Sequence, residues 1–414
     1  MEKYNLVVVG GGFAGFAAAF SASKSGAKVL LVEKGNALGG AAVNALVMPF
    51  MPFTTEINGE KTALSAGVFE TVCEELKKRG AYSVRKFDEE QLKYLLQEML
   101  LENGVELLFH AYIYGVEKEQ ENITAINVAT KSGSIQIEGD YFIDATGDAQ
   151  LAFLAGCPTR LGREPDNLCQ PMTLCFRVGN VDVEAFRKSE GALQKKYKEH
   201  LAQGKFINPR EDILVFSTLI PNVLHFNTTR VVKKNPTSPK EVTQAEIIAR
   251  RQVNEIYAFV KENADGMENS FIMSTAHEIG VRESRMIVGD YVLTEQDCRN
   301  FTKFEDGIAA CNYDIDIHNP EGSGTSHYYF PKGEYYTIPY RSLIPQKASN
   351  LLVAGRCISS DHGAQASYRI MPTVCCIGEA AGTAVAQAIN KGVSVREVDV
   401  NELRKTLKGN GAFI

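Results

Sequence analysis

The first 33 residues carry the pattern that most constrains the fold: a short apolar strand, a glycine-rich turn, a helix of small residues and a second apolar strand. The strand at 5–9 leads into the turn Gly10-Gly-Gly12-Phe-Ala-Gly15, and the strand at 28–32 ends on Glu33. The first glycine permits the tight turn, the second lets a diphosphate approach the main chain, and the third allows close packing of helix on strand. Free N–H groups at the helix start then face the phosphates. The spacing predicts a dinucleotide site in which Glu33 accepts hydrogen bonds from a ribose.

Three further segments indicate which dinucleotide is bound. A second glycine pair, Gly39-Gly40, follows Glu33, and a strand at 141–144 ends in Ala145-Thr-Gly147-Asp148. A late strand at 350–354 opens into Gly355-Arg356. A nicotinamide nucleotide does not need the second glycine pair, whereas the longer FAD molecule runs past this loop. The pattern therefore favours FAD.

Together these segments resemble the FAD-dependent oxidoreductases of the glutathione-reductase-like superfamily, and most of all a bacterial group named only for its cofactor. Family-like phrases also occur at 170–173, 277–285 and 336–345, so the resemblance runs from residue 5 to about residue 391. It implies an α/β fold, in which a Rossmann-like FAD-binding domain with an antiparallel β-meander carries an inserted mixed α+β substrate domain. We expect the FAD-binding domain to comprise 1–159 and 336–414, and the substrate domain 160–335.

The resemblance also implies which residues surround the cofactor. The diphosphate would lie on the first glycine turn, the adenine against the main chain of Ile113, and the flavin pyrimidine at a helix that begins at Pro372. For Arg356 the alternative is a surface arginine, and for that last helix a buried structural element. The predicted set is Gly10, Gly12, Phe13, Ala14, Gly15, Glu33, Lys34, Gly39, Gly40, Ala41, Ile113, Ala145, Gly147, Asp148, Gly355, Arg356, Pro372 and Thr373. No His or Cys follows the glycine pair where flavinylated relatives place one, so we expect non-covalent FAD.

Polar residues near the late glycine motif are the candidates for catalysis. An arginine beside a flavin binds a substrate carboxylate or stabilises the flavin anion, and a histidine can transfer a proton near neutral pH. The predicted catalytic residues are His362, Arg369, His318 and Asp316. Asp316 and His318 alternate, so in a strand they share one face. A hydrogen-bonded structural role remains the alternative for each histidine, and core packing remains the alternative to flavin contact for the Met-Pro-Phe loop at 47–53.

The remaining chain predicts the local elements. We expect helices at 66–79, 183–203 and 243–263, and another beginning at Asp88. Short strands at 105–109, 112–118, 123–129 and 134–138, separated by Gly-, Ser- and Asn-rich turns, are typical of an antiparallel meander.

Composition limits the partners. The net charge of −6 is spread over both signs, which argues against nucleic acid and anionic membranes as partners. The nine cysteines form no CxxC pair, so we expect no metal site, no disulfide-reductase chemistry and a reducing cytoplasmic location. Because the first strand begins within a few residues of Met1, we expect no signal peptide. We expect a small-molecule substrate and allow for a homo-oligomer.

These features favour an enzyme that moves a hydride between flavin N5 and a small organic substrate. Two alternatives remain open. One is a flavin monooxygenase that uses NAD(P)H transiently together with oxygen. The other is a non-catalytic flavin-loaded partner subunit or redox sensor.

Overall fold

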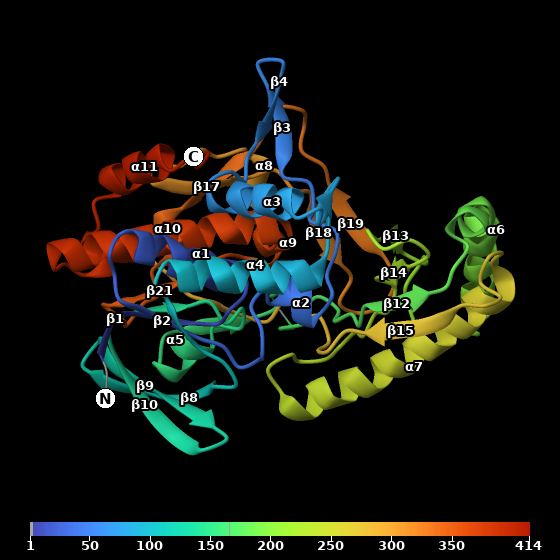
Figure 1. Cartoon of the computed structure of the whole chain (residues 1–414), viewed down its shortest axis with the longest axis horizontal. Coiled ribbons are helices and arrows are strands. Elements are labelled where there is room, and N and C mark those ends of the chain that lie inside the picture. Colours follow the sequence, from blue (N-terminus) through green and yellow to red (C-terminus); the bar gives the residue numbers. More distant parts are fainter. Residues whose placement is uncertain (1–2, 165) are drawn as a thin grey trace.

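A computed structural model describes residues 3–164 and 166–414, and its largest sheet lies at the centre of the FAD-binding part (Figure 1). The strands of this sheet are β1 (Lys3–Val9), β2 (Val29–Val32), β7 (Glu106–Leu108), β8 (Tyr112–Glu119), β9 (Asn122–Thr130), β10 (Gly133–Asp144) and β21 (Leu351–Val353). Their order is β7-β2-β1-β10-β9-β8, and β21 pairs with β10 outside that path. Parallel pairing joins β7, β2, β1, β10 and β21, so the predicted Rossmann-like fold is confirmed.

Two predicted meander strands need correction. The segment expected at 105–109 is β7, which pairs in parallel with β2 and not with the meander. The strand expected at 134–138 continues to Asp144, because the first half of β10 pairs antiparallel with β9 and the second half pairs parallel with β1. Gly139, which reads as a turn residue, lies within this strand, where a Cβ would come within 2.9 Å of Val7 Cγ2. The meander thus consists of β8, β9 and the first half of β10.

Helices cover one face of the large sheet. These are α1 (Phe13–Lys24), α3 (Val68–Lys78), α4 (Glu89–Glu102), α10 (Met371–Lys391) and α11 (Val400–Gly409). Leu6 and Val8 pack with these helices, while Val7 and Val9 face a second core under β8, β9 and α5 (Gln150–Leu154), as strand alternation requires. The helix starts predicted at Asp88 and Pro372 are confirmed: Asp88 caps α4, and Pro372 lies in the first turn of α10.

Close contact between α1 and α10 depends on two glycines. A Cβ on Gly378 would lie 2.0 Å from the carbonyl oxygen of Ala14, and one on Gly382 would lie 2.1 Å from that of Ala18. Only hydrogen fits at either position, which lets α10 pack directly against α1.

A second sheet, with its own core, lies beside the FAD-binding part (Figure 1). Its strands are β12 (Phe176–Gly179), β13 (Val215–Ser217), β14 (Leu224–Phe226) and β15 (Phe271–Thr275), covered by α6 (Val183–Ala202) and α7 (Pro239–Asn263). The prediction for α6 is confirmed, but α7 begins before the expected Thr243. Ser238 caps it, and Pro239 occupies the first position, which suits a residue without an N–H.

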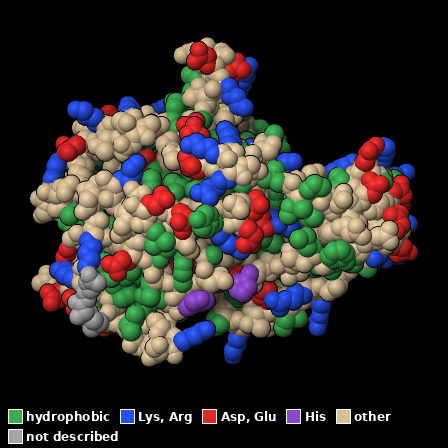
Figure 2. Space-filling view, viewed as in Figure 1, with side chains coloured by type: hydrophobic (Ala, Val, Ile, Leu, Met, Phe, Trp, Pro, Cys, Tyr) green, Lys and Arg blue, Asp and Glu red, His purple; other side chains and the backbone are tan. Residues whose placement is uncertain are grey.

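Smaller elements complete the chain. They are α2 (Ala41–Asn44), β3 (Thr54–Ile57), β4 (Glu60–Ala63), β5 (Tyr82–Ser83), β6 (Lys86–Phe87), β11 (Thr159–Leu161), β16 (Arg285–Ile287), α8 (Glu295–Arg299), β17 (Gly307–Cys311), β18 (Ile315–His318), β19 (Thr325–Tyr328), β20 (Tyr336–Pro339), η1 (Tyr340–Leu343), α9 (His362–Tyr368) and η2 (Val395–Glu397). Within the described ranges, no helix combines the length and the apolar character needed to cross a bilayer. Acidic and basic side chains are interspersed over the face shown in Figure 2.

Candidate functional site

The predicted dinucleotide residues gather around the start of α1. Gly39 N donates a hydrogen bond of 2.8 Å to Gly11 O, which places the second glycine pair against the first turn. Gly15 packs on Gly10, since a Cβ there would lie 1.8 Å from Gly10 O. On Gly12 the nearest atom to an added Cβ beyond the chain neighbours is Gly40 Cα, at 3.8 Å. The main chain is thus closed at Gly15 and open at Gly12, the position predicted to meet the diphosphate.

Helix capping distinguishes the two helices assigned to the cofactor. The N-cap residues of α1 and α10, Gly12 and Ile370, provide no side-chain hydrogen bond to the helix start. Asp88, Asp182 and Ser238, in contrast, cap α4, α6 and α7 with side-chain oxygens. The first N–H groups of α1 and α10 therefore lack the cap that other long helices carry, and an anionic or polar ligand would satisfy them.

Glu33 lies at this turn, and the residue is 6% exposed. Its carboxylate accepts hydrogen bonds from Gly11 N at 2.6 Å and Gly35 N at 2.7 Å. Ala111 N, just before Ile113, donates to Glu33 O. The acid therefore holds the glycine turn in place and brings the start of β8 alongside it. Lys34 points elsewhere, because its ammonium forms an ion pair with Glu278 at 2.9 Å.

The third and fourth predicted segments meet on the other side of α1. Arg356 Nη2 donates to Asp148 Oδ1 at 2.9 Å, and Ser284 Oγ approaches the same oxygen at 2.5 Å. A Cβ on Gly147 would lie 2.9 Å from Arg356 Cζ, so glycine makes room for the guanidinium. Arg356 Nε is buried without a hydrogen-bond partner among the described residues. One donor of this arginine is thus left for a ligand.

Other members of the predicted cofactor set lie within the same framework. A Cβ on Gly10 would meet Ala145 O at 2.4 Å, and one on Gly355 would meet Ala14 Cβ at 3.4 Å. Phe13 is buried and contacts Phe50 at 5.5 Å between ring centroids. Ala41 begins α2, and Pro372 and Thr373 are buried in the first turn of α10.

Gln170 joins the predicted catalytic residues to one another. Its Oε1 accepts hydrogen bonds of 3.3 Å from Arg369 Nη2 and from the main-chain N–H of His318. Its main-chain N–H donates to Glu283 Oε2 at 2.8 Å, and Glu283 Oε1 lies 2.8 Å from His362 Nδ1. One buried residue, through its side chain and its main-chain N–H, thus connects residues that are far apart in sequence.

His362 and the buried Glu283 form a pair. The Glu283 side chain is 0% exposed and that of His362 is 14% exposed. Because the carboxylate lies at Nδ1, that nitrogen carries the proton, and Nε2 forms no hydrogen bond within the described residues. His362 therefore presents one free nitrogen, fixed in orientation by an acid.

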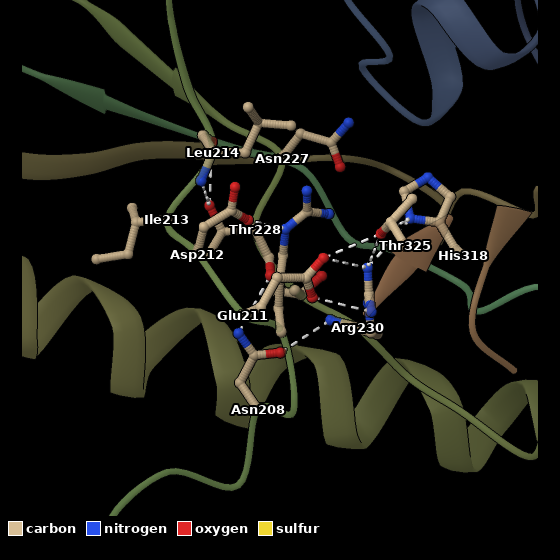
Figure 3. A network of polar contacts seen from close by, with 12 residues as sticks. Asn208, Glu211, Asp212, Ile213, Leu214, Asn227, Thr228, Arg230, His318 and Thr325 are labelled. Atoms are coloured by element: carbon tan, nitrogen blue, oxygen red, sulfur yellow. Dashed lines mark hydrogen bonds and ion pairs between the residues drawn. The ribbon is translucent and has the colours of Figure 1, made fainter. Parts of the chain in front are cut away.

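His318 is in a different state. Arg230 Nη2 lies 3.1 Å from His318 Nδ1, and an arginine can only donate, so Nδ1 accepts (Figure 3). Nε2 then carries the proton and points to Asp316 Oδ2 at 3.4 Å. Burial and the neighbouring Arg282 lower the pKa of His318 well below its usual range. The ring is neutral and both nitrogens are engaged, which suits positioning better than proton transfer.

Asp316 faces His318 from the same side of β18, as the alternation predicts. Burial opposes its charge, but hydrogen bonding to His318 and the charge of Arg369 keep its pKa below the usual range. Arg369 Nη2 lies 3.8 Å from Asp316 Oδ2. Asp314, Asp316 and His327 also bring ligand-type atoms within 4.8 Å of one another. The prediction of no metal stays a prediction.

Sequence reasoning missed several residues of this region. Arg230 and Glu211 belong to the network in Figure 3, and Glu283 orients His362. Glu283 lies in the family-like phrase at 277–285 and Gln170 in that at 170–173, which was the available signal. Within the Met-Pro-Phe loop, Phe50 packs in the core, which was the alternative to flavin contact. Its side chain is fully buried and stacks on Phe87 at 4.3 Å between ring centroids.

A family model described as "FAD dependent oxidoreductase" matches residues 5–407. The chain belongs to this family. Its cofactor is accordingly FAD, and the open turn at Gly12, the uncapped starts of α1 and α10 and the unpartnered Nε of Arg356 fit a ligand of that kind.

Curated relatives match over part of their length. A glutathione reductase of Debaryomyces hansenii is 29% identical over 168 residues, which cover 37% of this chain and 29% of the relative. A dihydrolipoamide dehydrogenase of Chaetomium thermophilum is 27% identical over 157 residues, covering 36% and 29%. The matched part is thus less than a third of either relative.

Solved structures also resemble the chain. A geranylgeranyl bacteriochlorophyll reductase-like protein of Thermoplasma acidophilum has a TM-score of 0.48 and 12% identity, covering 99% of this chain and 84% of the other. A p-nitrophenol 4-monooxygenase of Pseudomonas putida has a TM-score of 0.48 and 13% identity, covering 99% and 89%.

Proposed function

We propose that this FAD-dependent oxidoreductase transfers a hydride between flavin N5 and a small organic substrate, at a site formed by His362, Arg369, Asp316 and His318. Bound FAD supplies the atom that accepts or donates the hydride. The observation that carries the proposal is the pairing of His362 with the buried Glu283, joined through Gln170 to Arg369. We further propose that neither nucleic acid nor a membrane takes part.

Each side chain of the proposed site has a separate role. Glu283 holds the His362 ring with Nδ1 protonated, so Nε2 takes a proton from a substrate hydroxyl or amine, or returns one in the reverse direction. Gln170 and Asp316 both contact Arg369 at Nη2. His318 orients Asp316 and is itself held by Arg230.

The experiment begins with anaerobic mixing of purified protein with a panel of alcohols, amines, 2-hydroxy acids and amino acids, each acid paired with its amide. The reduced protein is mixed with activated alkenes. Bleaching or return of the flavin absorbance identifies a substrate. His362→Ala should then lower the rate of flavin reduction by about 10²-fold or more, the usual range for general acid–base catalysis. Glu283→Gln should shift its pH profile while FAD remains bound.

His200→Gln serves as the matched control, because His200 lies on α6 and contacts Phe206 and Phe259. Wild-type rates in both site variants would remove His362 from the mechanism. Flavin reduction by NAD(P)H followed by an oxygen adduct would instead identify a monooxygenase. Flavin cycling only with a partner protein would identify the non-catalytic alternative.

A further inference from the structure

Four arginines, Arg210, Arg230, Arg282 and Arg369, meet where the second sheet approaches β18 and α9. Arg230 is 1% exposed and Arg210 is 5% exposed. Burial, followed by the charges of Arg369, Arg210 and Arg230, lowers the pKa of Arg282 to about 9. These guanidinium groups are therefore close enough to repel one another in a region from which water is largely excluded.

The four arginines differ in the acidic partners that balance their charge. Glu211 pairs with Arg230 at 3.0 Å and Asp212 with Arg210 at 2.8 Å, but these acids are 37% and 42% exposed. Asp316 lies 3.8 Å from Arg369. Arg282 forms no ion pair within 4 Å among the described residues, although the charge of Asp316 acts on it, and its only side-chain hydrogen bond goes to the carbonyl of Pro171 at 2.6 Å. Arg282 is half-buried, and a cation shielded from water without an ion-pair partner is costly, so an anion would stabilise this region.

Unused donors point to the same conclusion. The hydrogen bond of Arg210 to Asp212 uses Nε, and its two terminal nitrogens have no partner among residues 3–164 and 166–414. Arg369 Nε is buried and unpaired within the same ranges. Arg230, in contrast, is held by Glu211, Thr325 and His318 (Figure 3). Arg210, Arg282 and Arg369 each retain unused N–H donors, whereas Arg230 is bonded at both terminal nitrogens and only its buried Nε is unpaired within the same ranges.

We infer that the substrate is a small carboxylate, bound by Arg282 and Arg369 with Arg210 as a second cationic contact. The planar guanidinium fork matches the two oxygens of a carboxylate. Arg282 has no ion pair to give up on binding, and the pair of Arg369 with Asp316 is long. The inference rests on the proposed function, because it names the substrate class of that same site.

Isothermal titration of the FAD-loaded protein tests this at constant ionic strength. The probes are malonate, succinate, glutarate and benzoate, each matched with its amide, together with inorganic phosphate. At least one carboxylate should bind at least tenfold more tightly than its amide, and Arg282→Met should weaken that binding at least tenfold. Arg251→Met, an exposed arginine on α7, is the matched control and should bind as the wild type does.

Equal binding of acids and amides, or no binding of any acid, would overturn the inference. Tighter binding of phosphate than of every carboxylate would overturn the carboxylate assignment. Unchanged carboxylate binding in Arg282→Met, with a shifted flavin potential, would assign Arg282 to the flavin instead. If Arg282→Met does not fold, the comparison of acid with amide in the wild type still decides.

Binding needs no turnover, so the two proposals fail separately. Carboxylate binding without hydride transfer would contradict the proposed function alone. Turnover of neutral substrates, with carboxylates binding no better than amides, would contradict only this inference.

Discussion

Gly12 and Gly15 belong to the same turn but are glycines for different physical reasons. At Gly15 the fold itself excludes a side chain, since Gly10 O would lie 1.8 Å from the new Cβ. At Gly12 the backbone φ of −68° suits any residue, and Gly40 Cα is 3.8 Å from an added Cβ. The constraint at Gly12 therefore comes from the ligand and not from the fold.

Substitutions should separate these two roles. Gly12→Val should fold with the thermal midpoint of wild-type apoprotein but bind FAD at least tenfold more weakly, because its side chain occupies the space of the diphosphate. Gly15→Val should lower the thermal midpoint of the apoprotein. Calorimetric melting and released flavin measure the two effects. Full FAD retention in Gly12→Val would show that the diphosphate lies elsewhere.

Single residues also mark the limit of the sequence-based prediction of the site. The spacing of the glycines and Glu33 predicts their own clustering, because one βαβ unit brings them together. Glu283, Arg230 and Arg210 lie in segments far apart in the sequence that the tertiary fold brings together, which no local pattern encodes. The two histidines illustrate this point, because only their partners, Glu283 and Arg230, reveal which ring nitrogen carries the proton.

At the scale of elements, α3 is capped from another helix. Glu379 of α10 accepts a hydrogen bond of 3.0 Å from Val68 N, and a Cβ on Gly67 would lie 2.5 Å from Glu379 Oε2. Burial raises the pKa of Glu379 from 4.5 to about 7. The native chain thus holds a proton that the unfolded chain releases between these two pH values.

This cap gives stability a defined pH dependence. As pH rises from about 4.5 to about 7, Glu379 should reduce the free energy of unfolding, on the order of 1–3 kcal/mol, and have no further effect above that range. Glu379→Gln keeps an oxygen acceptor and should remove this slope, so its advantage over the wild type should be greater at pH 8 than at pH 5. Urea denaturation at both values checks it.

Glu70→Gln, on the exposed side of α3, is the control. If Glu379→Gln and the wild type lose equal stability between the two pH values, the carboxyl is not the titrating group.

Elements were predicted best where local signals and tertiary pairing agree. Pro372 and Asp88 mark helix starts by their own chemistry, and both predictions are confirmed. The strand β10 was divided in the prediction because Gly139 reads as a turn. It is one strand because Val7 and Phe142 cover that glycine. Pairing partners decide such cases, and they lie far away in the sequence.

At the scale of the whole molecule, a buried ion pair links the second sheet to helix α4 of the FAD-binding part. Arg177 of β12 donates to both carboxylate oxygens of Glu89, the first residue of α4, with Nη2 to Oε2 at 2.6 Å. The two side chains are 6% and 12% exposed. Because Glu89 belongs to the FAD-binding part, this pair fixes the second sheet against it.

Removing one partner should be costly. Arg177→Met leaves the Glu89 carboxylate buried and should lower the free energy of unfolding by about 3–5 kcal/mol. Adding Glu89→Leu to this variant should restore most of the lost free energy of unfolding. The exposed pair Lys188–Glu184 on α6 is the control, and Lys188→Met should change stability by less than about 1 kcal/mol. Thermal melting that is no lower in Arg177→Met than in Lys188→Met would contradict this role.

The glycines of α10 also fix the position of this helix along α1. Gly378 and Gly382 are four residues apart, as are the Ala14 and Ala18 carbonyls they meet on α1. A slide of α10 by one residue would bring Ile377 or Glu379 to a place where only hydrogen fits. The two uncapped helix starts therefore cannot shift relative to each other in small steps. The α1–α10 pair behaves as one rigid unit, which keeps the free N–H groups of the two helix starts at a fixed distance from each other.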